Sequence, residues 1–375
     1  TIFMSQFKTA FAEAEDWTGV AKSCADQLLD TGLEDASLGF LYVTEPLIGD
    51  LSSILTYLRQ TTGVPHWVGA AAMGICVDAK EVFNRPAAAA MLTTLPEDQF
   101  RVLPTITDTL ENISGEITTW MGQRNPTLGI VHADPSNAKS PLLVQNLAET
   151  SSSFLVGGLT STRDKSRQVA DEVTSGGISG ILFAPEVQVS TGLSQGCVPV
   201  GESHLVSDSI DNVIIGLDGE KALDVFKNDI GELLSRDLNR VAGYVHAAIP
   251  IEGSDSGDYM VRDLVGIDPT RGWLAVGGNI QTGDRVMFVR RDPDTAQEDL
   301  VNTVEIIKNR LSGTARGGVY CSCIARSANM FGEEGREMAL IRECLGDVPL
   351  IGFYAGGEFS NARLYSYTGV LTLFL

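Results

Sequence analysis

The chain has 375 residues, of which 43% are hydrophobic and 20% charged, and this balance fits a folded globule of two ordinary domains or one large core. The formal net charge of −21, with no run of Lys and Arg that could neutralise phosphates, argues against nucleic acid or an anionic membrane as a partner. No secretory signal pattern and no apolar stretch of roughly 20 residues is present, so we expect a cytoplasmic protein.

An internal repeat organises the chain. Three apolar runs typical of buried strands each begin with a glycine: "GFLYVTEP" at Gly39, "GIVHADPS" at Gly129 and "GVYCSCIARS" at Gly318. Each run is followed by a helix pattern, by a second short strand that leads into glycines or alanines, and by a closing strand. The last closing strand, "LYSYTGVLTLF", is apolar on both faces, so we expect it in the middle of a sheet, where truncation would cost much stability.

Between the second and third copies, the sequence predicts a strand, a turn at Asp218 and Gly219, a short helix, and a meander of strands between Leu238 and Val289. A further helix, "TAQEDLVNTVEIIKNRL", leads into the third copy. These elements predict an α/β fold of mixed layered sheets flanked by helices, built from repeated strand-helix-strand-strand units. We place a domain boundary near residue 235, which gives domains of residues 1–235 and 236–375.

Two long motifs resemble the FIST (F-box and intracellular signal transduction) family. "GGISGILFAPEVQVSTGLSQGCVPVG" is similar to the N-terminal FIST half, and "GVYCSCIARSANMFG" with "PLIGFYAGGEFSNARLYSYTGVLTLF" is similar to the C-terminal half. The resemblance implies a sensory module for a small ligand, with amino acids or related metabolites proposed as ligands. It also implies an alternative, a haem protein that senses nitric oxide and regulates a histidine kinase. With both halves counted, no residues remain for an output domain, so we expect a stand-alone module that signals to a separate protein.

The third copy offers the best candidate ligand site. In "GFYAGGEF", glycines at the end of a core strand could expose N–H groups to a ligand carboxylate, while the adjacent carboxylate takes an ammonium group. The alternative is that the glycines only form a tight hairpin. Arg326 ends the first strand of this copy and could bind a carboxylate, or could form a surface ion pair. The predicted ligand-binding residues are Arg326, Tyr354, Gly356, Gly357, Glu358, Ser194 and Gln195.

Superposing the copies aligns two columns of residues on one face of the first strands: Tyr42, His132 and Cys321, and then Thr44, Asp134 and Cys323. Each column faces either a ligand cleft or a packed layer. For the haem alternative, His132 and His246 are the preferred axial-ligand candidates because both lie in apolar strands. The absence of C-x-x-C-H excludes covalent haem attachment, and a bound cofactor, haem b, belongs only to this alternative.

Enzymatic readings are weaker, and we expect no catalytic site. "GLSQG" around Ser194 matches the G-x-S-x-G pattern of a hydrolase, but no helix pattern follows it. Cys323 is the other candidate nucleophile, and no phosphate-binding loop is present. A structural subunit of a larger assembly is a further alternative, and the sequence leaves open whether the chain forms a homo-oligomer.

Overall fold

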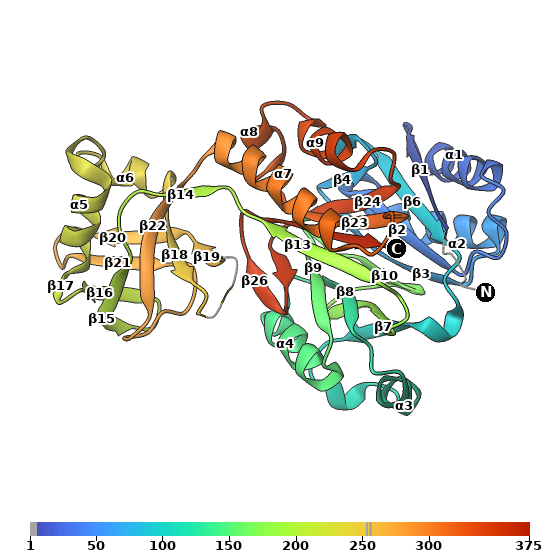
Figure 1. Cartoon of the computed structure of the whole chain (residues 1–375), viewed down its shortest axis with the longest axis horizontal. Coiled ribbons are helices and arrows are strands. Elements are labelled where there is room, and N and C mark those ends of the chain that lie inside the picture. Colours follow the sequence, from blue (N-terminus) through green and yellow to red (C-terminus); the bar gives the residue numbers. More distant parts are fainter. Residues whose placement is uncertain (1–5, 253, 255–256) are drawn as a thin grey trace. The chain divides into compact units, whose positions relative to one another are not determined.

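The computed structural model describes residues 6–252, 254 and 257–375, and the chain divides into two compact units. The first unit comprises residues 1–195 and 297–375, and the second comprises residues 196–296. The second unit is therefore an insertion into the first, and the chain passes between the units twice (Figure 1). The boundary that we place near residue 235 falls inside the second unit and stays a prediction about the two sequence halves.

The first unit contains the three predicted copies, and each copy is longer than the sequence pattern indicated. Every copy runs strand, helix, strand, helical segment, strand, two-stranded hairpin, strand. The first copy consists of β1 (Phe7–Glu13), α1 (Trp17–Asp30), β2 (Leu38–Thr44), α2 (Leu51–Thr62), β3 (His66–Ala72), β4 (Gly74–Val77), β5 (Lys80–Phe83) and β6 (Ala87–Thr93). The second consists of β7 (Phe100–Ile106), α3 (Gly115–Arg124), β8 (Leu128–Ala133), α4 (Ser140–Ser151), β9 (Phe154–Leu159), β10 (Gln168–Ala170), β11 (Glu172–Thr174) and β12 (Ile178–Phe183).

The third copy is interrupted by the second unit, which stands between its first strand and its first helix. It consists of β13 (Val189–Ser194), α7 (Pro293–Arg310), β23 (Gly317–Cys323), α8 (Ser327–Phe331), α9 (Arg336–Leu345), β24 (Leu350–Ala355), β25 (Glu358–Ser360), β26 (Arg363–Tyr365) and β27 (Gly369–Phe374). Short 3-10 helices precede α2, β7 and α3 in the first two copies: Glu45–Asp50, Glu97–Gln99 and Leu110–Asn112.

Strand pairing confirms the repeat. The first and second predicted strands of each copy pair in parallel, as β2 with β3, β8 with β9, and β23 with β24. The predicted closing strand lies antiparallel to the first strand, as β6, β12 and β27. The last of these, β27, is buried between β13 and β23, which confirms its predicted place in the middle of a sheet.

A hairpin from a different copy completes each sheet. The hairpin β10–β11 follows β9 in the chain but pairs with β3 of the first copy. In the same way β25–β26 pairs with β9, and β4–β5 pairs with β24. The exchange is cyclic, so no copy has a complete sheet by itself. We infer that the three copies fold as one cooperative unit.

Helices cover the outer faces of these sheets, and one shared core lies between their inner faces. The shared core takes residues from all three sheets, among them Phe40, Ile130 and Phe353. On the outer face of the first sheet, Val20 of α1 and Leu55 of α2 form a second apolar cluster. Burial on both faces explains why the central strands read as continuous apolar runs. In the described part of the chain, no helix has the length and apolarity that crossing a membrane requires.

The second unit contains the strands predicted between Leu238 and Val289, but the predicted meander is wrong, because strands that follow one another in the chain are not all neighbours in the sheet. It forms a nine-stranded sheet with two short helices: β14 (Cys197–Pro199), β15 (His204–Ile210), β16 (Val213–Leu217), β17 (Glu220–Lys221), α5 (Ala222–Ser235), α6 (Leu238–Val241), β18 (Val245–Pro250), β19 (Tyr259–Arg262), β20 (Leu264–Asp268), β21 (Trp273–Val276) and β22 (Arg285–Arg291). The predicted turn is present, since Asp218 and Gly219 have positive φ values of 51° and 85° between β16 and β17.

Three equivalent glycines allow the close approach of the parallel strands. Gly69, Gly157 and Gly352 are equivalent residues of the second strand in each copy. Each lies directly opposite the fourth residue of the first strand. A Cβ atom added to Gly157 would lie 2.0 Å from the carbonyl oxygen of Val131, and the residue has a φ of +128°. Only a backbone shift could accommodate a side chain there.

We predict that Gly157→Ala lowers the free energy of unfolding by at least about 2 kcal/mol, because the clash is with backbone in a packed core. Gly122→Ala in α3 is the control, since a Cβ there meets no atom within 4 Å. That variant should be neutral or more stable by up to about 1 kcal/mol. Chemical denaturation followed by circular dichroism measures both, and equal stabilities would contradict the prediction.

Candidate functional site

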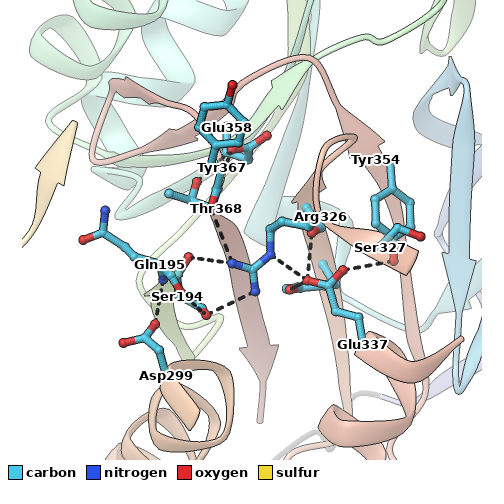
Figure 2. A network of polar contacts seen from close by, with 12 residues as sticks. Ser194, Gln195, Asp299, Arg326, Ser327, Glu337, Tyr354, Glu358, Tyr367 and Thr368 are labelled. Atoms are coloured by element: carbon cyan, nitrogen blue, oxygen red, sulfur yellow. Dashed lines mark hydrogen bonds and ion pairs between the residues drawn. The ribbon is translucent and has the colours of Figure 1, made fainter. Parts of the chain in front are cut away.

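The predicted polar residues of the third copy meet in the interior of the first unit (Figure 2). Arg326 follows β23, Ser194 is the last residue of β13, and Glu358 is the first residue of β25. All three are at most 1% exposed. The structure therefore brings together residues from strands that are far apart in the sequence, and it places them in a buried cluster.

Arg326 forms a buried ion pair with Glu337 of α9. Its Nε atom donates to Oε1 of Glu337 over 2.8 Å, and both side chains are almost fully buried. The guanidinium also lies 5.2 Å from the ring centre of Phe331. Burial acts to lower the pKa of Arg326, but the adjacent Glu337 carboxylate outweighs this effect and keeps the pKa above its usual value. The surface ion pair that we considered as an alternative is thus an interior one.

Three hydroxyl groups complete the shell around Glu337. Tyr320 and Ser322 donate to Oε1 over 2.6 and 2.9 Å, and Tyr354 donates to Oε2 over 3.3 Å. Tyr354, which we predicted as a ligand contact, is therefore engaged by Glu337 in this structure. With its charge paired and its oxygens bonded, Glu337 fixes the position of Arg326.

Sequence reasoning missed Glu337, although a signal for it exists. The helix α9 buries Met338, Leu340 and Ile341, and Glu337 shares their face because it stands three and four residues before the last two. A carboxylate at an apolar position of a helix pattern indicates a buried partner. Thr368 and Asp299, which also contact predicted site residues, gave no comparable signal.

Glu358 has one oxygen bonded and one oxygen without a partner. Its Oε2 atom accepts hydrogen bonds from the backbone N–H and the hydroxyl of Thr368, over 3.2 and 2.8 Å. Its Oε1 atom is buried and has no hydrogen-bond partner among the residues that the structure describes. Burial raises the pKa of Glu358 to about 8, although the bonds from Thr368 and the charge of Arg326 act in the opposite direction.

The outer nitrogens of Arg326 make only long contacts. Nη2 donates to the Ser194 hydroxyl over 3.3 Å, and Nη1 lies 3.5 Å from the carbonyl oxygens of both Ser194 and Tyr367. Gln195, the other predicted residue of this strand end, donates its backbone N–H to Asp299 over 2.6 Å. We use the name Glu358 cluster for Glu358, Thr368, Tyr367, Arg326 and Ser194.

The two predicted glycines have a different role from both of the roles that we considered. The hairpin reading is wrong, because β24 and β25 belong to different sheets, and Gly356 and Gly357 form the crossing between them. The N–H of Gly356 donates to the carbonyl oxygen of Leu159 over 2.9 Å, so it does not face a ligand. The glycines instead carry the exchanged hairpin and place Glu358 at its first position.

A third buried carboxylate is that of Glu81. Glu81, which is 4% exposed, accepts hydrogen bonds from Ser327 Oγ and from the backbone N–H of Met338, each over 3.1 Å. Burial, together with the charge of Glu337, raises the pKa of Glu81. Both of its oxygens are satisfied within the protein, in contrast to Glu358.

Neither predicted haem ligand offers a clear axial position. Nε2 of His132 lies 2.8 Å from the Tyr42 hydroxyl, and the imidazole is in ring contact with Tyr42 and Phe353 at centre distances of 5.4 and 5.5 Å. Burial lowers the pKa of His132 to about 3, so the ring is neutral, and its Nδ1 atom has no hydrogen-bond partner among the described residues, but the aromatic rings pack against the imidazole. In the second unit, Nδ1 of His246 lies 3.1 Å from Asp263, a contact that orients a ligand or a structural histidine equally well. Haem binding stays a prediction.

The two candidate nucleophiles lie in surroundings that do not activate them. Ser194 is buried against Arg326 and is followed by the short strand β14, and not by the helix that the G-x-S-x-G pattern requires. Burial raises the pKa of Cys323, which disfavours its reactive thiolate form. Tyr42 and Cys321, which we aligned in one column with His132, line the shared core, and His132 is buried against Tyr42, so this column is packing.

The fold and this buried cluster define an α/β protein built from three interlocked repeats with a smaller inserted unit. The chain belongs to the FIST family: the FIST N domain matches residues 37–220, and the FIST C domain matches residues 222–361. FIST domains are sensory domains that bind small ligands in signal transduction. The resemblance that the sequence motifs indicated is thereby confirmed.

Mycobacterial proteins of similar length resemble the chain over most of its extent. The uncharacterized protein Rv0628c of Mycobacterium tuberculosis (strain H37Rv) is 31% identical over 329 residues, which cover 82% of this chain and 83% of that protein. The uncharacterized protein Mb0898c of Mycobacterium bovis is 28% identical over 363 residues, which cover 91% of each. Among solved structures, T. maritima PurL complexed with ATP aligns with 99% of this chain and 71% of that chain, at 11% identity and a TM-score of 0.25, which is too weak to indicate a shared fold.

We predict that Arg326→Met lowers the free energy of unfolding of the first unit by about 3–5 kcal/mol, because it leaves the Glu337 carboxylate buried without its cation. Urea denaturation measures the loss. In Arg326→Met/Glu337→Gln, part of the stability should return, and a double variant as unstable as the sum of its singles would show that the pair is not coupled.

We predict that Glu358→Gln removes part of the pH dependence of stability. A carboxyl group whose pKa rises from 4.5 in the unfolded chain to about 8 in the fold holds its proton more tightly when folded. Its stabilising effect is therefore complete below pH 4.5 and is lost as the pH rises to 8, by up to about 1.4 kcal/mol for each pH unit relative to the variant. Denaturation curves from pH 4.5 to 8.5 measure this, and parallel profiles for the two proteins would contradict the pKa assignment.

Proposed function

We propose that this chain is a sensory module that binds a zwitterionic metabolite, an amino acid or a close relative, at the Glu358 cluster and passes the signal to a partner protein such as a histidine kinase. The single observation that carries the proposal is the Oε1 atom of Glu358, a buried oxygen with no hydrogen-bond partner among the described residues. Such an atom costs stability unless a donor reaches it. The ammonium group of a ligand supplies such donors.

Arg326 offers the complementary group. Its Nη1 atom has two contacts at 3.5 Å, beyond the usual hydrogen-bond length, so its hydrogens are poorly used. A ligand carboxylate would form shorter and charge-assisted bonds there. Arg326 and Glu358 flank the same short segment, because Arg326 contacts the carbonyl oxygen of Tyr367 and Glu358 binds the N–H of Thr368. Opposite charges on either side of one peptide unit suit the small separation between the two groups of an amino acid.

The charge balance of the interior also favours a cationic group. Three buried carboxylates, Glu81, Glu337 and Glu358, belong to this part of the first unit, and among its described residues the guanidinium of Arg326 is bonded to Glu337. Burial raises the pKa of both Glu81 and Glu358, and the charge of Glu337 adds to this effect at Glu81. An ammonium group would replace the proton of Glu358 and restore the balance.

Tyr367 is the residue through which we expect a ligand to enter. It is half-buried, directly precedes Thr368, which bonds Glu358 (Figure 2), and has a φ of +64°, a conformation that is strained for an aromatic residue. Rotation of this residue would open the way to Glu358, and relief of the strain would offset part of the cost of opening.

A thermal-shift screen tests the proposal. We predict that glycine or L-alanine stabilises the protein by about 2.7 kcal/mol at 100 times its Kd, seen as a rise of several degrees in Tm, whereas methylammonium alone or acetate alone stabilises it less. In Glu358→Gln the shift should disappear, because the variant cannot hold a full negative charge opposite the ammonium. Binding to the native protein at pH 7 should also release a proton, measured by calorimetry in two buffers, since the ammonium favours the charged form of Glu358.

Glu81→Gln is the matched control, since it removes a buried carboxylate whose two oxygens are already bonded within the protein. We expect this variant to keep the ligand-induced shift. An unchanged shift in Glu358→Gln would remove the Glu358 cluster as the site. A shift lost in both variants would assign the effect to general stability and not to direct contact.

A further inference from the structure

The polypeptide leaves and re-enters the first unit next to the Glu358 cluster. The outgoing segment passes from Ser194 and Gln195 to Gly196, where the second unit begins. The returning segment re-enters at Gln297 in helix α7, two residues before Asp299. Of the five residues of the Glu358 cluster, Ser194 is thus also the last residue but one before the inserted unit.

Contacts within the first unit fasten both segments. The Nη2 atom of Arg326 donates to the Ser194 hydroxyl over 3.3 Å, and its Nη1 atom lies at the longer distance of 3.5 Å from the Ser194 carbonyl oxygen. The backbone N–H of Gln195 donates to the carboxylate of Asp299 over 2.6 Å, which ties the outgoing segment to the returning one. Arg326 itself is anchored by Glu337, so it is a fixed point against which the outgoing segment is held.

A second route leads from Glu358 to the same segment. Thr368, which binds Glu358, directly precedes Gly369, and Gly369 is the ladder partner of Ser194 in the pairing of β13 with β27. A change in the hydrogen bond between Glu358 and Thr368 therefore acts on Thr368, whose neighbour Gly369 pairs with Ser194. Both charged ends of the proposed ligand would thus act on the start of the outgoing segment.

We propose that the contacts of Arg326 with Ser194, and of Gln195 with Asp299, form a latch on the two connections to the inserted unit, and that a ligand in the Glu358 cluster opens it. This inference rests on the proposed function for its ligand arm only. The two states are defined by the partner of Arg326, which is either the Ser194 oxygens or the ligand carboxylate, because the same Nη atoms cannot serve both at short distance. The ligand therefore binds the open latch better, as a shift between two states requires. Freedom of the inserted unit is then the signal that a partner protein reads.

Spin labels on the two units test the latch in the full chain. Leu29→Cys in α1 and Val265→Cys in β20 provide exposed label positions, at 53% and 60% exposure, in a background carrying Cys344→Ser. The other five cysteines are buried and should not react. We expect Ser194→Ala/Asp299→Ala, without any ligand, to give about a two-fold increase in the width of the distance distribution. Saturating glycine should broaden the distribution of the native protein and not that of Glu358→Gln.

The control is Ser312→Ala, which removes a hydroxyl bonded to Gln188 near the opposite end of β13 and should leave the distribution unchanged. An unchanged distribution in the double variant overturns the latch, whether or not glycine binds. If glycine raises Tm through Glu358 but leaves the distance distribution as it was, the proposed function stands and the inference fails. If glycine gives no thermal shift while the double variant broadens the distribution, the latch stands and the ligand class fails.

Discussion

The cyclic exchange of hairpins is the constraint on which the rest of the first unit depends. Each copy gives its hairpin to another copy's sheet, so the segments after β3, β9 and β24 all cross between sheets. These crossings bind one another: Ser161 accepts from the N–H of Met73 and donates to the carbonyl oxygen of Tyr354, and Gly356 donates to Leu159. The carboxyl ends of the central parallel strands therefore meet, which is where α/β folds commonly hold ligands.

A different side chain bonds the start of the closing strand in each copy, and this difference explains the position of Glu358. In the first copy, the hydroxyl of Thr44 bonds the start of the closing strand at Ala87, and in the second the carboxylate of Asp134 accepts from Gly176 just before the closing strand. The equivalent residue of the third copy is Cys323, a weak hydrogen-bonding group. There Glu358, supplied by the exchanged hairpin, bonds Thr368 at the start of the closing strand. A carboxylate that bonds Thr368 needs only one oxygen for this, so its second oxygen is left without a hydrogen bond.

The features that the sequence predicted correctly are those that depend on local sequence pattern. The repeat, the strand order within each copy and the turn at Asp218 follow from hydrophobic period and turn residues, and the structure confirms them. Exchange between copies could not be read, because Gly356 and Gly357 look the same before a hairpin and before a crossing. The insertion was hidden for a similar reason: the change from helix to strands near residue 235 is local, whereas the return of the chain to the first unit is a long-range contact.

The same limit applies to the polar residues, and it bears on what the cluster can do. Arg326 and Glu358 were identified as charges at strand ends. Their burial, however, depends on distant segments that cover them, the end of β13 at Ser194 and the bend at Tyr367. Burial reverses the expected use of each group. A surface arginine binds ligands freely, but a buried one bound to Glu337 is a fixed anchor with two long and replaceable contacts. A surface carboxylate is charged at neutral pH, whereas burial raises the pKa of Glu358 to about 8. In the proposed function, the proton and the ligand amine would therefore compete for one carboxylate, and binding would depend on pH.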